Sequence, residues 1–246
     1  KKCKDNEISF DKMMNIYWKN NIIAKLIKGS TIINPKIFLS NFILLDDIDK
    51  SNIKTRLSKF VKKSIASFMS PITLLDLKDK RAINGVIYQL NECLGSIKLY
   101  KEKKVISNLS SNDIKMLLDS GVKIGELFIW VPKLFEKRNR EYLWSLRQIF
   151  YESNNGSTYP SIETVINKKN APKEILNSNE FILIGENYYN FQLIEKIAKK
   201  IKEIIKHKKI FFTNKKNSSY FSKKYKLSHS QLKDILHILN FKRDKI

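Results

Sequence analysis

The residues with the clearest chemical potential lie near the end of the chain, where lysines and tyrosines occur together. Lys223, Lys224 and Lys226 stand within a few positions of Tyr220 and Tyr225. An ammonium group attracts phosphate oxygens, and an aromatic ring offers a face on which a nucleic-acid base can stack. The segment therefore predicts contact with a sugar–phosphate strand. For the two tyrosines, base stacking and core packing both remain open.

The same chemistry extends further along the chain. Lys233 falls on the polar side of the next apolar periodic segment, and Lys242 and Arg243 follow that segment. All three are candidate phosphate contacts. A small domain needs aromatic side chains in its core, and this is our interpretation of three phenylalanines in the same region. They are Phe211, Phe221 and Phe241.

Motifs for catalysis are missing from the sequence. It contains no Gly-x-x-x-x-Gly-Lys-[Ser/Thr], no Gly-x-Gly-x-x-Gly and no Gly-x-Ser-x-Gly. His207, His229 and His237 have no Cys or carboxylate at a metal-ligand spacing. We interpret the Asp-rich stretch 46–49 as a helix start, because Asp favours that position. The sequence therefore predicts no catalytic residue and no metal ligand.

The charge of the chain favours a polyanionic partner. The chain has 47 Lys and Arg against 24 Asp and Glu, a net charge of +23. Residues 191–246 alone hold 16 of the basic residues and 4 of the acidic ones. This concentration points to nucleic acid. The alternative is compositional, because 41 Lys against 6 Arg, with frequent Ile and Asn, is also typical of an AT-rich genome.

Length and composition are those of a folded protein with one to three domains. The chain has 246 residues and is 42% hydrophobic. No uncharged apolar run is long enough for a membrane span, so we expect no membrane partner. Cys3 and Cys93 lie far apart, and we interpret both as reduced thiols of a cytoplasmic protein. The first residue is Lys1, and we expect the sequence to be part of a longer chain.

The predicted fold class is mostly α with small β elements, arranged in three consecutive domains. Residues 1–49 are expected to form a β-rich segment, with strands in the apolar runs at 22–24, 26–27, 31–33, 37–39 and 42–45. Residues 50–152 are expected to be helical, with Pro71 ending or kinking the first helix and a buried strand at 122–132. A linker at 152–160 leads to a winged-helix-like basic domain, 160–246.

This last domain has the most distinct order of elements. An apolar hairpin at 181–189 precedes a long Lys-rich helix, a short helix at 218–225 and an amphipathic helix at 228–239. Ser228 and Gln231 have the spacing of a capping box, and Leu232, Ile235, Leu236 and Leu239 form the apolar stripe. Lys242 and Arg243 would open a wing strand. Winged-helix modules that bind nucleic acid are built in this order.

Four stretches of the chain carry a family resemblance. They are residues 23–35 with Gly29 and Pro35, 71–95 with Gly85 and Gly95, 121–144 with Gly121, Gly125 and Pro132, and 181–241. Together they resemble the C-terminal, non-motor region of a bacterial superfamily 2 (DExH-type) helicase group related to the mitochondrial degradosome RNA helicase. The last stretch also resembles the winged helices of the selenocysteine-specific elongation factor. The chain is Lys- and Ile-rich where the family is Arg- and Ala-rich, and its wing after Arg243 is nearly absent.

The resemblance implies an accessory region of an ATP-dependent helicase that braces the motor and binds the backbone of RNA or DNA. The partners would be a nucleic acid and the upstream motor domains. ATP and Mg would belong to that motor, so no cofactor is expected in this segment. Two alternatives remain: a stand-alone winged-helix DNA-binding protein, and a protein-docking scaffold.

Overall fold

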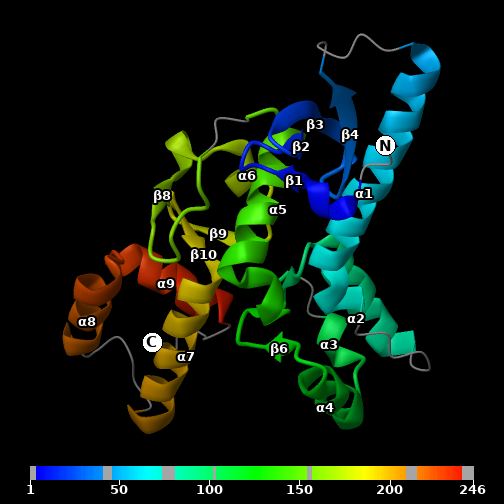
Figure 1. Cartoon of the computed structure of the whole chain (residues 1–246). Helices are drawn as coiled ribbons and strands as arrows, with labels where there is room; N and C mark the ends of the chain where they lie inside the picture. The colour runs from blue at the N-terminus through cyan, green and yellow to red at the C-terminus, as the bar shows by residue number, and fades with distance from the viewer. Residues whose placement is uncertain are drawn as a thin grey trace. The chain divides into compact units, whose positions relative to one another are not determined.

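The structure is a computed structural model that describes residues 4–40, 46–73, 81–101, 104–153, 157–208 and 215–239 (Figure 1). The chain forms two compact units. Unit 1 comprises Lys1–Leu74, Lys133–Tyr159 and Pro172–Glu174. Unit 2 comprises Leu75–Pro132, Pro160–Ala171 and Ile175–Ile246. The units thus combine segments that are distant in sequence, whereas the sequence suggested three consecutive domains.

Unit 1 contains a four-stranded antiparallel sheet in the order β1-β2-β3-β4. Its strands are β1 (Ile8–Phe10), β2 (Asn15–Trp18), β3 (Asn21–Thr31) and β4 (Asn34–Leu39), and the short helix η1 (Asp5–Glu7) precedes them. One face alternates into the core, with Ala24 and Leu26 fully buried. Gly29 permits a close approach at the β3–β4 hairpin, because a Cβ there would collide with the carbonyl of Asn34.

Helices cover the buried face of this sheet. α5 (Lys137–Phe150) packs against β3 and β4, and α1 (Asp47–Thr73) packs against β4. α1 buries a stripe of apolar residues at 3–4 spacing, including Leu57, Val61 and Ile65. Its first turn is capped, since the Asp46 carboxylate accepts from the Asp49 amide at 2.7 Å. The remaining short elements nearby are η2 (Pro132–Phe135) and α6 (Lys173–Leu176).

The first half of unit 2 surrounds a small sheet in the order β5-β7-β6. The strands are β5 (Ser96–Lys98), β6 (Lys123–Ile124) and β7 (Phe128–Trp130), with helices α2 (Arg81–Glu92), α3 (Lys104–Ser107) and α4 (Ser111–Asp119). The Ser110 hydroxyl accepts from the Asp113 amide, and the Asp113 carboxylate accepts from the Ser110 amide, which completes a capping box. Phe128 and Ile129 are fully buried, as expected for this apolar run.

The second half of unit 2 holds the basic helices. The strands β8 (Ile166–Asn167), β9 (Phe181–Ile184) and β10 (Asn187–Asn190) form a sheet in the order β8-β10-β9, and η3 (Lys168–Asn170) follows β8. Gly185 turns the β9–β10 hairpin with a φ of 59°. Then come α7 (Phe191–Lys208), α8 (Lys215–Tyr225) and α9 (His229–Ile238). Phe191 of α7 packs its ring on Phe128 of β7 at 5.3 Å, so the two halves share a core.

The predicted fold class is confirmed: the structure is mostly α with small β elements, and its N-terminal segment is β-rich. One local prediction was wrong: Ile32 and Ile33 form the turn between β3 and β4 and not a strand. Pro71, predicted to end or kink the first helix, lies inside the last turns of α1. In the described ranges, no helix is both long and apolar enough to cross a bilayer.

The stretch predicted as a linker is partly packed. Tyr159 is only 7% exposed, and its ring lies edge-on to Trp144 with the centroids 5.5 Å apart. The Trp144 indole N–H donates to the carbonyl of Ser157 at 3.0 Å. The polar composition of 152–160 concealed this anchoring, which needs only one aromatic residue in contact with α5.

Candidate nucleic-acid interface

The candidate interface is built on the turn between α8 and α9. Lys226 adopts a left-handed conformation with a φ of 54°, which ends α8 and redirects the chain. Leu227 follows and is buried. Ser228 then caps α9: its hydroxyl accepts from the Gln231 amide at 3.2 Å, and the Gln231 side chain accepts from the Ser228 amide at 2.9 Å. This confirms the predicted capping box.

α9 turns its apolar stripe inward and its polar residues outward. Leu232, Ile235 and Leu236 are buried, and Leu239 just after the helix is half-buried. Gln231 is also buried, and its amide donates to the carbonyl of Ile184 in β9 at 3.4 Å. The outward residues are His229, Ser230, Lys233, Asp234 and His237. The one glutamine that could have read base edges is therefore engaged inside unit 2.

Aromatic rings and a lysine form a cluster on α8. Phe221 is fully buried and stacks on Tyr225, with the centroids 5.8 Å apart. Tyr220 lies edge-on to both rings and is 38% exposed. The Lys224 ammonium donates to the Tyr220 hydroxyl at 3.0 Å and lies 5.4 Å from the ring centroids of Tyr220 and Tyr225. Lys224 is thus a cation held by the Tyr220 hydroxyl, close to the rings of both tyrosines.

This contact changes the acid–base behaviour of both partners. The hydrogen bond from Lys224 lowers the pKa of the Tyr220 phenol, and the same bond raises the pKa of the Lys224 ammonium. The charge of Lys200 on α7 also lowers the pKa of Tyr220. α7 therefore contributes to the electrostatics of the cluster, which the sequence analysis missed because the contact joins separate helices.

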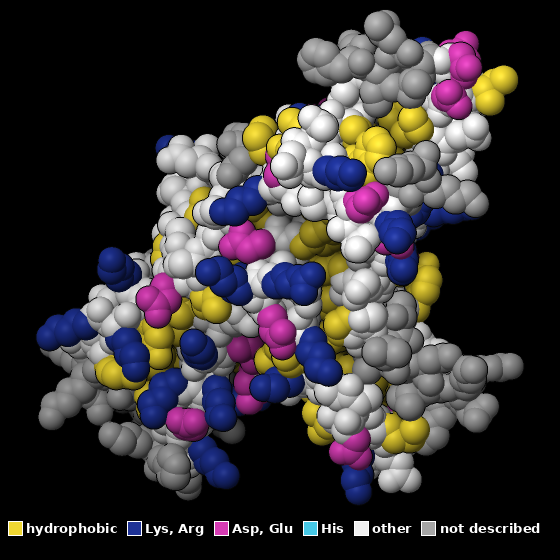
Figure 2. Space-filling view, in the orientation of Figure 1, with side chains coloured by type: hydrophobic (Ala, Val, Ile, Leu, Met, Phe, Trp, Pro, Cys, Tyr) yellow, Lys and Arg dark blue, Asp and Glu magenta, His cyan; other side chains and the backbone are white. Residues whose placement is uncertain are grey.

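Exposed lysines on α7 extend the positive charge, and Figure 2 shows Lys and Arg side chains gathered over this helix. We call the exposed lysines of α7, together with those of α8, α9 and the turn between them, the basic face. Its members are Lys196, Lys199, Lys200, Lys206, Lys223, Lys224, Lys226 and Lys233, all exposed. Outside 191–246, unit 2 carries 11 Lys and Arg and 10 Asp and Glu. Nearly all of its net charge thus comes from the segment that contains these helices.

Some of the residues predicted to contact nucleic acid lie in the described ranges, and others lie outside them. Lys223, Lys226 and Lys233 are exposed, and within the described ranges no carboxylate forms an ion pair with them or with Lys224. Tyr220 and Tyr225 belong to the cluster on α8, and Phe221 is core, as predicted. Lys242, Arg243, Phe211 and Phe241 lie outside the residues that the structure describes. The predicted wing is outside them as well.

The arrangement can hold a phosphate chain and stack a base, which is binding chemistry. In the part of the chain that the structure describes, no group of three His, Cys, Asp or Glu residues is arranged to hold a metal ion. His229 and His237 are exposed on α9. Comparison of the chain with protein-family models, with curated proteins and with solved structures found no match.

Proposed function

We propose that this chain is the accessory, non-motor region of an ATP-dependent helicase and that its basic face holds an RNA or DNA strand by the backbone. The observation that carries the proposal is that lysines and an exposed tyrosine lie together at the C-terminal end of α8 and in the turn after it. Lys223, Lys224 and Lys226 offer charge to phosphates, while the exposed ring of Tyr220 offers a surface to a base. The resemblance of four stretches to helicase accessory regions supplies the link to a motor.

The proposed mode of binding is independent of sequence. Phosphate contacts position a protein on a strand but do not select bases, which suits an enzyme that moves along nucleic acid. The engagement of Gln231 with Ile184 and Ser228 argues against the alternative of a sequence-specific DNA-binding protein. The other alternative is a docking scaffold, and charge reversal at the basic face distinguishes it from a nucleic-acid-binding protein.

The first experiment reverses charge at the C-terminal end of α8 and in the turn after it. Changing Lys223, Lys224 and Lys226 to Glu is expected to weaken binding of a fluorescein-labelled oligouridine at least tenfold, because three favourable phosphate contacts become repulsive. The matched control changes Lys54, Lys59 and Lys62 on α1, which are also exposed. Both variants alter net charge equally, so only the position of the charges differs. Equal affinity of the two variants would favour the scaffold.

Salt dependence provides an independent measure of the same contacts. For single strands, the logarithm of the binding constant falls with the logarithm of salt by about 0.7 per phosphate neutralised. Replacing the three lysines with Gln is therefore expected to reduce this slope by about 2. The proposed link to a helicase motor is tested by sequencing the coding region upstream of Lys1. A phosphate loop and an Asp-Glu box are expected there.

A further inference from the structure

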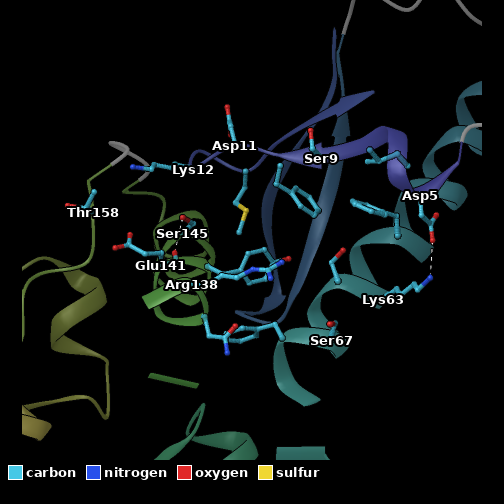
Figure 3. A pocket seen from close by; sticks show the side chains of 18 of the residues that line it. Asp5, Ser9, Asp11, Lys12, Lys63, Ser67, Arg138, Glu141, Ser145 and Thr158 are labelled. Atoms are coloured by element: carbon cyan, nitrogen blue, oxygen red, sulfur yellow. Dashed lines mark hydrogen bonds and ion pairs between the residues drawn. The ribbon is translucent and has the colours of Figure 1, made fainter. Parts of the chain in front are cut away.

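Unit 1 contains a groove that the basic face does not involve. Its volume is about 840 Å³, within the range of roughly 300–1,000 Å³ that is usual for ligand pockets. Figure 3 shows Lys63 and Ser67 of α1 on one side, Arg138 and Glu141 of α5 on the other, and β1 with the turn after it along the top. The groove therefore lies where the first helix, the sheet edge and α5 meet.

The apolar part of the groove is aromatic. Phe10 of β1 stacks on Phe60 of α1, with the centroids 5.2 Å apart and the planes at 27°. Tyr142 of α5 lies edge-on to Phe10 at 6.2 Å. All three residues line the groove and are half-buried, so part of each side chain stays exposed. Such rings provide surface on which flat, unpaired bases can stack.

The two aspartates that line the groove have hydrogen-bond partners of their own. Asp5 is engaged by Arg56 and by Lys63, whose ammonium lies 3.1 Å from the carboxylate. Asp11 accepts from the backbone and side-chain amides of Asn15 at 2.8 and 2.7 Å. Asp5 is thus paired with two cations, whereas Asp11 is hydrogen-bonded by neutral amides and keeps its negative charge.

Among the described residues, two cations and two acids of the lining, Asp11 and Glu141, form no ion pair. Lys12 and Arg138 are exposed, and among the described residues neither forms an ion pair. Glu141 is half-buried and can accept from an amino or hydroxyl group of a ligand. Hydroxyl groups complete the lining, namely those of Ser9, Ser64, Ser67, Ser145, Ser157 and Thr158.

A nucleotide unit carries matching groups: a flat base, a hydroxylated sugar and a phosphate. We propose that this groove holds a segment of single-stranded nucleic acid, with bases against Phe10, Phe60 and Tyr142 and phosphates toward Lys12 and Arg138. This inference rests on the proposed function and extends it, because it assigns unit 1 a second contact with the strand. Arg138 is the central residue, since Figure 3 shows its side chain directed into the groove.

The test uses the full chain and two kinds of change. Lys12→Glu with Arg138→Glu is expected to weaken binding of the labelled oligouridine about tenfold, because two phosphate contacts become repulsive. Lys54→Glu with Lys59→Glu is the matched control, as both lysines are exposed on α1 and neither lines the groove. Ser67→Trp fills the groove without changing charge and is expected to weaken binding by a similar factor. Far-UV circular dichroism confirms that each variant is folded.

The outcomes separate this inference from the proposed function. If the groove variants bind like their control while the α8 triple variant still loses affinity, the groove inference is wrong and the proposed function stands. Loss with the charge changes but not with Ser67→Trp also overturns it, since occlusion must matter. A wild-type chain that binds no oligouridine ends both proposals. If uridine monophosphate alone binds the groove as tightly as the oligonucleotide, the site is a nucleotide pocket and the strand is excluded.

A positional readout completes the test. An oligonucleotide carrying 4-thiouridine is expected to crosslink, on irradiation, to peptides that contain Phe10, Phe60 or Tyr142. The Ser67→Trp variant should lose these crosslinks and keep those to α8. Crosslinks confined to unit 2 in the wild-type chain would contradict the inference.

Discussion

Glu195 shows how one residue can organise a distant loop. Its carboxylate, on α7, accepts from three successive backbone amides: Glu126 at 2.9 Å, and Leu127 and Phe128 at 2.7 Å each. Gly125 precedes this loop, and a Cβ there would collide with the carboxylate. The Glu195 carboxylate thus supplies the hydrogen-bond acceptors that the three loop amides would otherwise lack. The absence of a side chain at Gly125 is what allows the approach.

Replacing Glu195 with Gln is expected to destabilise the protein by about 1–3 kcal/mol, because one of the three amides then faces an N–H group. Urea denaturation at pH 7 measures the effect. Glu203→Gln, on the exposed side of the same helix, is the control and should change stability by less than about 0.5 kcal/mol. A Glu195 variant as stable as wild type would mean that the loop at residues 126–128 keeps its conformation without the carboxylate.

The same pair of proteins gives a pH signature. Burial raises the pKa of Glu195 and outweighs the opposing effect of the three amide bonds. The folded state therefore holds a proton at pH values where the unfolded state has released it. Stability from this group is present below the ordinary Glu pKa and falls as the pH rises through the raised value. The Gln variant should lack this fall, so the difference between the two proteins should depend on pH.

At the scale of elements, the caps decide where helices begin. Ser228 and Ser110 each complete a capping box at the start of α9 and α4. Both could be predicted because the cap and its partner lie three residues apart in sequence. α9 also positions Lys233, so its cap supports the candidate interface. Local chemistry of this kind is visible in the sequence before any tertiary contact is known.

Ser228→Ala is expected to cost about 1 kcal/mol, since the Gln231 amide loses its acceptor. Thermal and urea unfolding measure the loss, and Ser222→Ala on the exposed side of α8 serves as the comparison. RNA affinity should fall less than for the charge-reversal variant, because the lysines remain. A larger loss of affinity than of stability would imply that Ser228 itself touches the strand.

Much of the helical fold could be predicted, whereas the sheets and sites could be predicted only in part. The spacing of Leu57, Val61 and Ile65 is enough to indicate α1. β1 and β2 were not predicted individually, because each is at most four residues long and mixes polar with apolar side chains. The groove was not predicted at all. Its residues come from 5–14, 60–68, 138–145 and 157–158, and only the tertiary fold brings them together.

At the scale of the whole molecule, charge alone does not identify the interface. Unit 1 carries 20 Lys and Arg against 10 Asp and Glu, so both units are basic. What distinguishes the basic face is its local density of exposed lysines next to aromatic rings. A compositional preference for Lys would raise charge everywhere, but it would not explain an ammonium bonded to the Tyr220 hydroxyl and close to the Tyr225 ring.

The chain by itself is expected to hydrolyse no ATP, with or without RNA. Its sequence contains no phosphate-loop motif, and the proposal assigns nucleotide hydrolysis to a separate motor. A coupled assay at high protein concentration measures this. ATP hydrolysis above that of a protein-free sample, retained through two purification steps, would contradict the proposal that only the motor hydrolyses ATP.

The interleaving of the two units has a consequence for biosynthesis. A ribosome releases β1 to β4 early, but it completes α5 only after the strands β5, β6 and β7 of the other unit. Until then the apolar face of the first sheet, with Ala24 and Leu26, lacks one of its two helical covers. Nascent chains with such an uncovered surface are prone to aggregate and depend on chaperones. Slower translation should therefore prolong the period in which this protein needs such protection.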